Sequence, residues 1–448
     1  MTFDDLKTLL FARSNFGMKL GLDRMRAALK LLGDPHTSAP VLHVAGTNGK
    51  GSTCAFTESA LRVAGLKTGL TTSPHLVHWC ERIRINGVPL SEQAAADTLE
   101  EILARVPWAL QGGPEGAHDG DGLTFFELTT LLAFLAFAKS RVQVMVVEVG
   151  LGGRLDATNV VEPLACAVAP LGLEHTQYLG PTLTHSAAEK AGIFKPGVTA
   201  VSAGQPLEAA RVLVVRAREV GAPLWRPGRD YRFESRHDRP FCFAGKSDLP
   251  VCGAWTVKLE APLPLLGHHQ RTNAALACAL LQAGAARGLP IEPAHVEQGL
   301  LRARWPGRLE KLSDRPLTLL DGAHNPHAAH ALAKTLPEVA GARPVQLVLG
   351  VLADKDARQI LEPLLPLVHT LHTCAPDNPR ALEGEALAAV ARTLRPDLPI
   401  VVHKRAPEAL AAARAQAGAD GAVLAAGSLY LVGELEPGGR VKMPSEKL

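Results

Sequence analysis

A glycine-rich loop between an apolar run and a helical pattern is the feature that most constrains the fold of this chain. The apolar run Val41–Ala45 breaks at Gly46, and a helical pattern resumes after Ser52 and continues through Arg62. A loop that joins a strand to a helix brings backbone N–H groups and the positive end of the helix dipole to one place, where an anion can bind. The segment Ala45–Ser52 (AGTNGKGS) therefore predicts a phosphate-binding loop in an α/β sheet.

The residues of this loop suit a magnesium nucleotide. Gly46, Gly49 and Gly51 allow tight turns and a close approach of the backbone to phosphate. Lys50 supplies a positive charge for the β- and γ-phosphates, and Ser52 supplies a hydroxyl group for the metal ion. The spacing departs from G-x-x-x-x-G-K-[ST], because valine replaces the first glycine and a glycine separates the lysine from the serine. The alternative is a glycine-rich turn with a solvated lysine.

Candidate metal ligands follow other predicted strands. Val142–Val149 is typical of a buried parallel strand, and Glu148 lies near its carboxyl end, where open α/β sheets bind ligands. A carboxylate at this place can hold Mg²⁺ near nucleotide phosphates. Ser73, His75 and His175 also follow apolar runs and could face the same crevice. The alternative for each residue is a structural role, such as a hydrogen bond to neighbouring backbone.

The rest of the pattern indicates two α/β domains. Strands alternate with helix-length segments over residues 1–300, which implies βαβ units in a P-loop-type nucleotide-binding domain. Within it, residues 225–262 change to short alternating pieces and predict a small β appendage. Residues 301–306 predict a linker, and residues 307–448 a C-terminal Rossmann-like α/β domain. The strands expected in that second domain are Leu317–Leu320, Val345–Leu349, Val368–Cys374, Ile400–His403 and Ala422–Ala426.

Composition narrows the class of protein. A length of 448 residues exceeds one ordinary core, and 47 basic against 44 acidic residues give no general attraction to nucleic acid or membrane. The seven cysteines are scattered singly, which argues against a disulfide framework and a zinc site. The N-terminus has no signal-peptide pattern, and the longest apolar run, Leu131–Ala138, is too short to span a bilayer. We therefore expect a cytoplasmic enzyme, and nothing in the sequence requires an oligomer.

Polar residues also follow the strands of the second domain. Asp321, His324 and Asn325 lie in the loop after one predicted strand, and Ser428 lies in the loop after the last one. Strand-end loops of two domains that face each other predict an enzyme that closes a cleft on its substrates. The alternative is that these are ordinary turn residues. Lys190 lies in a predicted helix and, by pattern alone, is expected on the surface.

Nine motifs in order between residues 46 and 434 resemble one known family. They are GTNGKGS, TSPHL…ERIRING, TFFE, EVGLGGRLDATN, EKAGIFK, PGRLE, DGAHNP, LADKD and GSLYLVGE. Together they look like bacterial folylpolyglutamate synthase/dihydrofolate synthase, in the Mur-ligase superfamily, and LGLDR (Leu20–Arg24) resembles that family's pterin-side segment. The resemblance implies an ATP-dependent ligase. ATP would phosphorylate the carboxylate of dihydropteroate or of the terminal glutamate of a reduced folate, and the amine of L-glutamate would attack the acyl phosphate.

The resemblance also implies roles for individual residues. Those for ATP are Gly49, Lys50, Gly51, Ser52, Asn273, Arg308 and Asp321. Those for Mg²⁺ are Ser73, Glu148 and His175. Those that would frame the pterin are Met18, Lys19, Leu20, Leu123, Thr124, Phe125, Phe126, Leu155, Asp156 and Ala157, with Asp156 as the polar anchor. Those for catalysis or glutamate placement are Lys50, Lys190, His324 and Ser428, and Lys190 matches a lysine that the family carbamylates.

The chain departs from the family at Glu174, at Gln177-Tyr178 and at Pro170-Leu171, and two rival functions are possible. The chain has Glu174 before His175 where the family usually has aspartate, and the added methylene could shift a hydrogen bond near the metal. A Mur-type ligase for a cell-wall nucleotide precursor is one rival, but about 45 residues before the loop are too few for a UDP-sugar domain. A nucleotide-binding regulatory module is the other, and the presence of Lys50, Glu148 and His324 argues against it.

Overall fold

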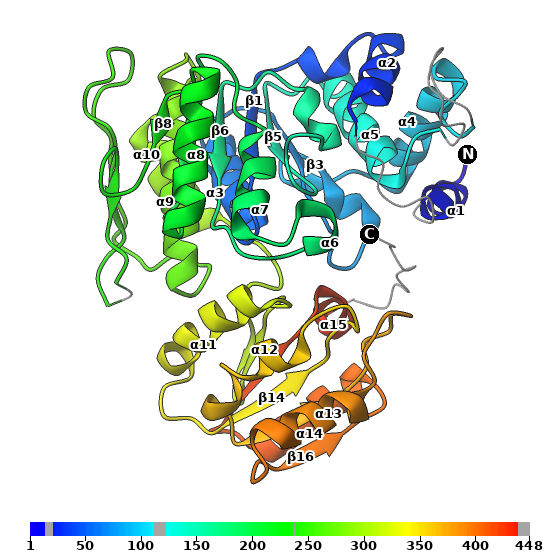
Figure 1. The fold of residues 1–448 in the computed structure, drawn as a ribbon, viewed down its shortest axis with the longest axis vertical. Helices are drawn as coiled ribbons and strands as arrows, with labels where there is room; N and C mark the ends of the chain where they lie inside the picture. The colour runs from blue at the N-terminus through cyan, green and yellow to red at the C-terminus, as the bar shows by residue number, and fades with distance from the viewer. Residues whose placement is uncertain (14–20, 112–121, 237, 438–448) are drawn as a thin grey trace.

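A computed structural model describes residues 1–13, 21–111, 122–236 and 238–437 of this chain. It has two parts, each built around its own sheet (Figure 1). We call them the first and the second domain. No helix within the described ranges is long and apolar enough to cross a membrane.

The sheet of the first domain has eight strands in the order β4-β3-β2-β5-β1-β6-β7-β8. Their bounds are β1 (Val41–Ala45), β2 (Thr68–Thr71), β3 (Ile83–Ile85), β4 (Val88–Pro89), β5 (Val144–Glu148), β6 (Ala165–Val168), β7 (Thr199–Ser202) and β8 (Leu224–Trp225). The pairs from β2 to β8 are parallel, whereas β3 and β4 add an antiparallel edge. Strand β1 lies near the centre and is buried along its whole length, so the loop after it starts from a rigid base.

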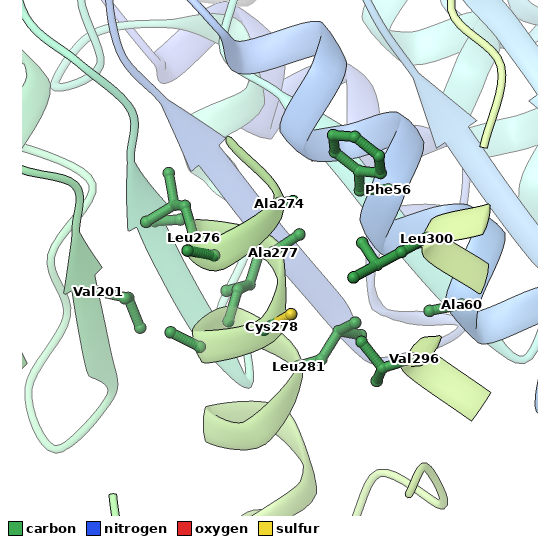
Figure 2. Close-up of a cluster of buried hydrophobic side chains, with 14 of the residues drawn as sticks. Phe56, Ala60, Val201, Ala274, Leu276, Ala277, Cys278, Leu281, Val296 and Leu300 are labelled. Atoms are coloured by element: carbon green, nitrogen blue, oxygen red, sulfur yellow. The ribbon is translucent and has the colours of Figure 1, made fainter. Parts of the chain in front are cut away.

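Helices cover both faces of this sheet, as a parallel sheet requires. Their bounds are α1 (Phe3–Arg13), α2 (Asp23–Leu31), α3 (Lys50–Val63), α4 (Glu92–Arg105), α5 (Phe125–Lys139), α6 (Thr176–Leu179), α7 (Leu183–Ala191), α8 (Leu207–Val220), α9 (His268–Ala285) and α10 (Pro293–Arg302), with short 3₁₀ turns at η2 (Pro35–Thr37), η3 (Trp79–Arg82) and η4 (Ala157–Val160). On one face α3, α9 and α10 pack together, and Figure 2 shows Phe56, Leu281 and Leu300 from these three helices in one apolar cluster. On the other face lie α5 beside β5, and α7 and α8 beside β6 and β7.

The β appendage is smaller than expected. Strands β9 (Arg232–Phe233), β10 (Cys242–Ala244) and β11 (Thr256–Lys258) form a three-stranded antiparallel sheet. The expected start at residue 225 is wrong, because Trp225 belongs to β8 and pairs in parallel with Val201 of the main sheet. A strand of two residues is too short to show a periodicity in sequence.

The sheet of the second domain has six strands in the order β12-β13-β17-β14-β15-β16. Their bounds are β12 (Glu310–Asp314), β13 (Leu317–Leu320), β14 (Val345–Leu349), β15 (Thr370–Thr373), β16 (Ile400–Val402) and β17 (Ala422–Ala426). The helices are α11 (Pro326–Ala340), α12 (Ala357–Leu361), α13 (Gly384–Leu394), α14 (Ala406–Ala417) and α15 (Leu429–Leu435), with a 3₁₀ turn at η5 (Leu365–Leu367). All five predicted strands are confirmed. The sequence analysis missed β12, a polar edge strand that pairs antiparallel with β13.

The predicted linker 301–306 overlaps helix α10, which ends at Arg302. Leu301 and Arg302 belong to the last turn of α10, because the helix-breaking Pro306-Gly307 pair comes only four residues later. The non-helical connection therefore starts at Ala303. Its Trp305 packs against the phosphate loop, where a Cβ added to Gly51 would lie 2.8 Å from the indole nitrogen. The connection between the domains therefore contacts the predicted nucleotide site.

Candidate active site

A cavity of about 290 Å³ lies between strand-end loops of both sheets. The loops after β1, β2 and β5 line it from the first domain, and those after β13, β14, β15 and β17 from the second. Open α/β sheets bind ligands at this end of their strands. The predicted site residues that line the cavity are Gly49, Lys50, Gly51, Ser73, Thr124, Phe125, Phe126, Glu148, Leu155, Asp156, Ala157, His175, Arg308, His324 and Ser428.

Several predicted residues do not line this cavity. They are Ser52, Leu123, Lys190, Asn273 and Asp321, which are all buried. The predicted pterin residues Met18, Lys19 and Leu20 lie outside the described residues. Leu123 is a packing residue whose carbonyl oxygen accepts a hydrogen bond from Arg13 Nε at 2.8 Å. The structure therefore brings most, but not all, of the predicted set to one surface.

The phosphate loop presents the start of α3 to the cavity. The helix begins at Lys50, and Gly49 precedes it with φ +87° and no side-chain cap. The first N–H groups of the helix therefore remain available to an anion. Lys50 Nζ donates to the carbonyl oxygens of Gly46 and Thr47 at 3.2 Å, so this ammonium group lies over the loop.

Asn273 packs against the phosphate loop, whereas Asp321 forms hydrogen bonds within the second domain. A Cβ on Gly49 would lie 2.2 Å from Asn273 Oδ1, so glycine is required for the loop to approach α9. The carboxylate of Asp321 accepts hydrogen bonds from the backbone N–H groups of Leu309 and Ala323, at 2.9 and 2.8 Å. Asp321 thus joins the start of the second domain to the loop that carries His324.

The candidate metal ligands include a buried carboxylate and a neutral imidazole. Glu148 Oε2 accepts the backbone N–H of Ser73 at 3.1 Å. Burial raises the pKa of Glu148, and the positive charge of Lys50 opposes that rise. Burial lowers the pKa of His175 to about 4, so its ring is neutral at physiological pH and can ligate a metal.

This donor set fits a magnesium ion that is shared with a nucleotide. No cluster of three or more His, Cys, Asp or Glu side chains within the described parts of the chain could hold a metal. Mg²⁺ usually takes one or two carboxylates and completes its shell with phosphate oxygens and water. Glu148, the Ser73 hydroxyl group and His175 would supply the protein's share.

Glu174 connects the two domains. Its Oε1 lies 3.2 Å from Nε2 of His324 and 3.7 Å from Nζ of Lys355, both in the second domain. Burial alone would raise the pKa of Glu174, but the hydrogen bond to His324 and the nearby charges outweigh it and hold that pKa well below its usual range. The Glu174 side chain therefore contacts the second domain directly.

Lys190 is not on the surface. Its side chain is buried, and none of the described residues forms a hydrogen bond or ion pair with its Nζ. Burial and the charge of Lys50 lower the pKa of Lys190 to about 7. The prediction that Lys190 lies on the surface was wrong. The buried residues of α7 are Ser186, Ala187, Lys190 and Ala191. Because the other three are small and only weakly hydrophobic, the sequence does not indicate that this face of the helix is buried.

Aromatic and cationic residues form one wall of the cavity, where the pterin residues were predicted. Thr124 caps α5 in a reciprocal pair with Glu127, and this fixes the start of the helix. Phe125 stacks on Phe11 with ring centroids 5.5 Å apart, and the Arg82 guanidinium lies over the same ring at 5.2 Å. A flat aromatic ring system with polar edges suits such a wall.

Sequence reasoning missed several residues that line the cavity. They are Arg13, Arg82, Glu127, Lys355 and Arg380. A signal existed for three of them, because Arg82 lies in the motif ERIRING, Glu127 in TFFE and Lys355 in LADKD. Arg13 and Arg380 lie in segments that carry no motif, so only the fold brings them to the site.

Known proteins resemble the chain over almost its whole length. A family model described as "Mur ligase, glutamate ligase domain" matches residues 307–429. A probable bifunctional folylpolyglutamate synthase/dihydropteroate synthase of Halobacterium salinarum is 38% identical over 97% of this chain, but the chain spans only 51% of that protein. The dihydrofolate synthase/folylpolyglutamate synthase of Bacillus subtilis is 36% identical over 85% of this chain and 86% of its own length.

Solved structures agree with these relatives. Escherichia coli FolC in complex with DHPP and ADP superposes with a TM-score of 0.84 at 34% identity, over 96% of both chains. A Yersinia pestis bifunctional folylpolyglutamate synthase/dihydrofolate synthase, complexed with AMPPNP and Mn ion, gives a TM-score of 0.80 at 32% identity over 93% of this chain and 92% of that one. The chain belongs to the folylpolyglutamate synthase/dihydrofolate synthase family of the Mur-ligase superfamily.

Proposed function

We propose that this chain joins L-glutamate to the carboxylate of dihydropteroate, of a reduced folate, or of both, and uses ATP to activate that carboxylate. One observation carries the proposal. The uncapped start of α3 with Lys50, the buried Glu148, the aromatic wall at Phe125 and the second-domain His324 all border one cavity. Nucleotide, metal, pterin and amino acid can therefore meet in one place.

The first chemical step is phosphoryl transfer. An oxygen of the acceptor carboxylate attacks the γ-phosphorus of ATP, and ADP leaves with the electron pair of the broken P–O bond. Such a transfer depends on alignment and charge neutralisation more than on covalent help from the protein. Lys50 and the N–H groups of α3 would bind the phosphates, and Glu148, Ser73 and His175 would hold Mg²⁺, which neutralises phosphate charge.

The second step forms the amide. The amine nitrogen of L-glutamate attacks the acyl carbon, phosphate leaves, and the nitrogen gives up a proton. His324 and Ser428 lie on the second-domain side of the cavity, and we assign them to the placement of glutamate. Gly322 O lies 2.7 Å from Nδ1 of His324, and the Glu174 carboxylate faces its Nε2. These two acceptors fix the orientation of the ring.

We also propose that Lys190 is carbamylated. A lysine with a pKa of about 7 is partly a free amine at neutral pH, and its nitrogen can add to the carbon of CO₂ with loss of one proton. The new carboxylate would lie near the positive charge of Lys50, which is among the groups that shift the pKa of Lys190. It would replace an unpaired buried amine by an anion with a cationic neighbour.

An acceptor assay tests the function. The full chain is incubated with ATP, Mg²⁺, labelled L-glutamate and either dihydropteroate or tetrahydrofolate. We expect ADP release that depends on glutamate and on at least one acceptor, with label transferred to that acceptor. The absence of glutamate-dependent ADP release with both acceptors would rule out the proposed function.

A further inference from the structure

The phosphate-binding loop meets the loop after β6 and the first turn of α11, two segments that are distant from it in sequence. The backbone N–H groups of Thr47 and Asn48 both donate to the carbonyl oxygen of Pro170, at 3.1 and 3.2 Å. The Thr47 hydroxyl group and the backbone of Gly172 add two hydrogen bonds of 3.1 Å. A Cβ on Gly172 would lie 3.2 Å from His327 of the second domain. The loops that carry residues 47 and 172 are therefore joined by hydrogen bonds, and the first turn of α11, which carries His327, packs against them.

Two asparagine side chains join the domains across this junction. Asn48 Nδ2 donates to Asn325 Oδ1 at 3.1 Å, and Asn325 Nδ2 donates to Asn48 Oδ1 at 3.1 Å. The two amides thus form a closed ring of two hydrogen bonds between residues 277 positions apart in sequence. Each amide offers one donor and one acceptor to its partner, and such reciprocity fixes their relative orientation as well as their distance.

One further donor and one further acceptor of the pair are also used. Asn48 Nδ2 lies 2.8 Å from Nδ1 of His327, and Asn325 Oδ1 accepts the backbone N–H of Ala328 as the cap of α11. Burial lowers the pKa of His327, so its ring is neutral and Nδ1 can accept the second amide hydrogen of Asn48. Asn325 itself is buried, with 3% of its surface exposed.

Each asparagine of the pair is adjacent in sequence to a residue of the candidate active site. Asn48 lies within the phosphate-binding loop, immediately before Gly49, and Asn325 immediately follows His324. A contact between these two residues therefore sets the separation of the phosphate loop and the second-domain wall. We propose that Asn48 and Asn325, with His327, form an interdomain clasp that holds His324 at a fixed distance from the phosphate-binding loop. The effect of the clasp on kcat/KM rests on the proposed function, whereas its effect on the distance between the domains does not.

Two substitutions separate the clasp from other roles of these residues. Asn325→Asp keeps an oxygen that can cap α11, because aspartate is as good a cap as asparagine, but it removes the donor to Asn48. Asn48→Ala removes the other half of the ring and leaves the loop backbone unchanged. Asn86→Asp, at an exposed turn, is the matched control for an asparagine-to-aspartate change.

The first readout is the interdomain distance without nucleotide. Spin labels on cysteines placed at the exposed Glu208 of α8 and the exposed Ala415 of α14 report it by pulsed electron resonance, in a background with Cys242→Ser and Cys252→Ser. We expect one narrow distribution for the parent and for Asn86→Asp, and a broader one for each clasp variant. Unchanged distributions in both clasp variants would overturn the proposal, whether or not the chain proves to be a glutamate ligase.

The second readout is a double-mutant cycle in the acceptor assay. Asn325→Asp loses one neutral hydrogen bond of the ring and Asn48→Ala loses both, which predicts a fall in kcat/KM of up to about 10-fold for the first variant and about 10-fold or more for the second. Because both variants break the same ring, the double variant should lose no more than the worse single one. Losses that multiply in the double variant would show that the two asparagines act independently, and this result would refute the clasp.

Discussion

Glu174 Oε1 in the first domain lies 3.2 Å from Nε2 of His324 in the second domain. We predict that Glu174→Gln lowers kcat/KM by about 10-fold or more, because a hydrogen bond to a charged group contributes about 1.5–3 kcal/mol. Glu174→Asp keeps the charge and restores the residue usual in the family, so it should retain more activity than Glu174→Gln. Steady-state kinetics with each variant measure this, and wild-type rates for Glu174→Gln would contradict a role for the contact.

Lys50→Ala should abolish turnover and leave the fold intact. The ammonium group lies over the phosphate loop rather than in the core, so its removal creates no cavity. The measurements are the acceptor assay and the thermal midpoint, with Lys30→Ala on the exposed face of α2 as control. An active variant with ordinary ATP saturation would show that Lys50 does not hold the phosphates.

Glu148→Gln should weaken activity and the response to Mg²⁺ together. The amide has nearly the same shape as the carboxylate but carries no charge for a cation. Titration of the rate with MgCl₂ should give a higher half-saturating concentration for this variant, whereas the exposed Glu208→Gln should behave as wild type. An unchanged Mg²⁺ titration would remove Glu148 from the ligand set.

Lys190 should make stability depend on pH in a defined direction. Its pKa is about 7 in the folded chain, below the ordinary value of 10.5, so between these values the unfolded chain binds more protons. The free energy of unfolding should therefore rise with pH above 7, by at most about 1.4 kcal/mol per pH unit, relative to Lys190→Met. Denaturation at pH 7 and 8.5 in CO₂-free buffer measures the difference. Parallel behaviour of the two proteins would mean that the pKa of Lys190 is not lowered.

Carbamylation of Lys190 has its own signature. With ¹³C-bicarbonate, the wild-type chain should show a carbamate carbon signal that Lys190→Met lacks. The signal should grow with pH through the range in which the amine loses its proton. A spectrum identical to that of the variant would leave Lys190 as a plain buried lysine.

Short sequence patterns correctly predicted the strands, loops and helices whose conformation is determined by neighbouring residues. The strand Val41–Ala45 has the bounds expected from its apolar run, and the helix after the loop has an end within one residue of the expected Arg62. The two-sheet α/β fold was also predicted correctly, from alternating strand and helix patterns, and the ligase family from ordered motifs. These features depend on short runs of residues whose hydrophobicity and turn preferences agree.

Features that depend on distant contacts were not predictable. The burial of Lys190 arises from the packing of α7, and the clasp joins Asn48 to a residue in another domain. The strand at Leu224–Trp225 forms because β7 offers an open edge, not because its own sequence is a strong strand former. A single sequence carries no record of such pairings.

The central claim is that triphosphate and a divalent metal bind between the Gly49–Lys50 turn and Glu148. Crystals grown with a non-hydrolysable ATP analogue and Mn²⁺ test it most directly, because the anomalous signal of manganese locates the metal. We expect an anomalous peak beside the carboxylate of Glu148 and triphosphate density at the start of α3. Nucleotide and metal density elsewhere, with this cavity empty, would contradict the account.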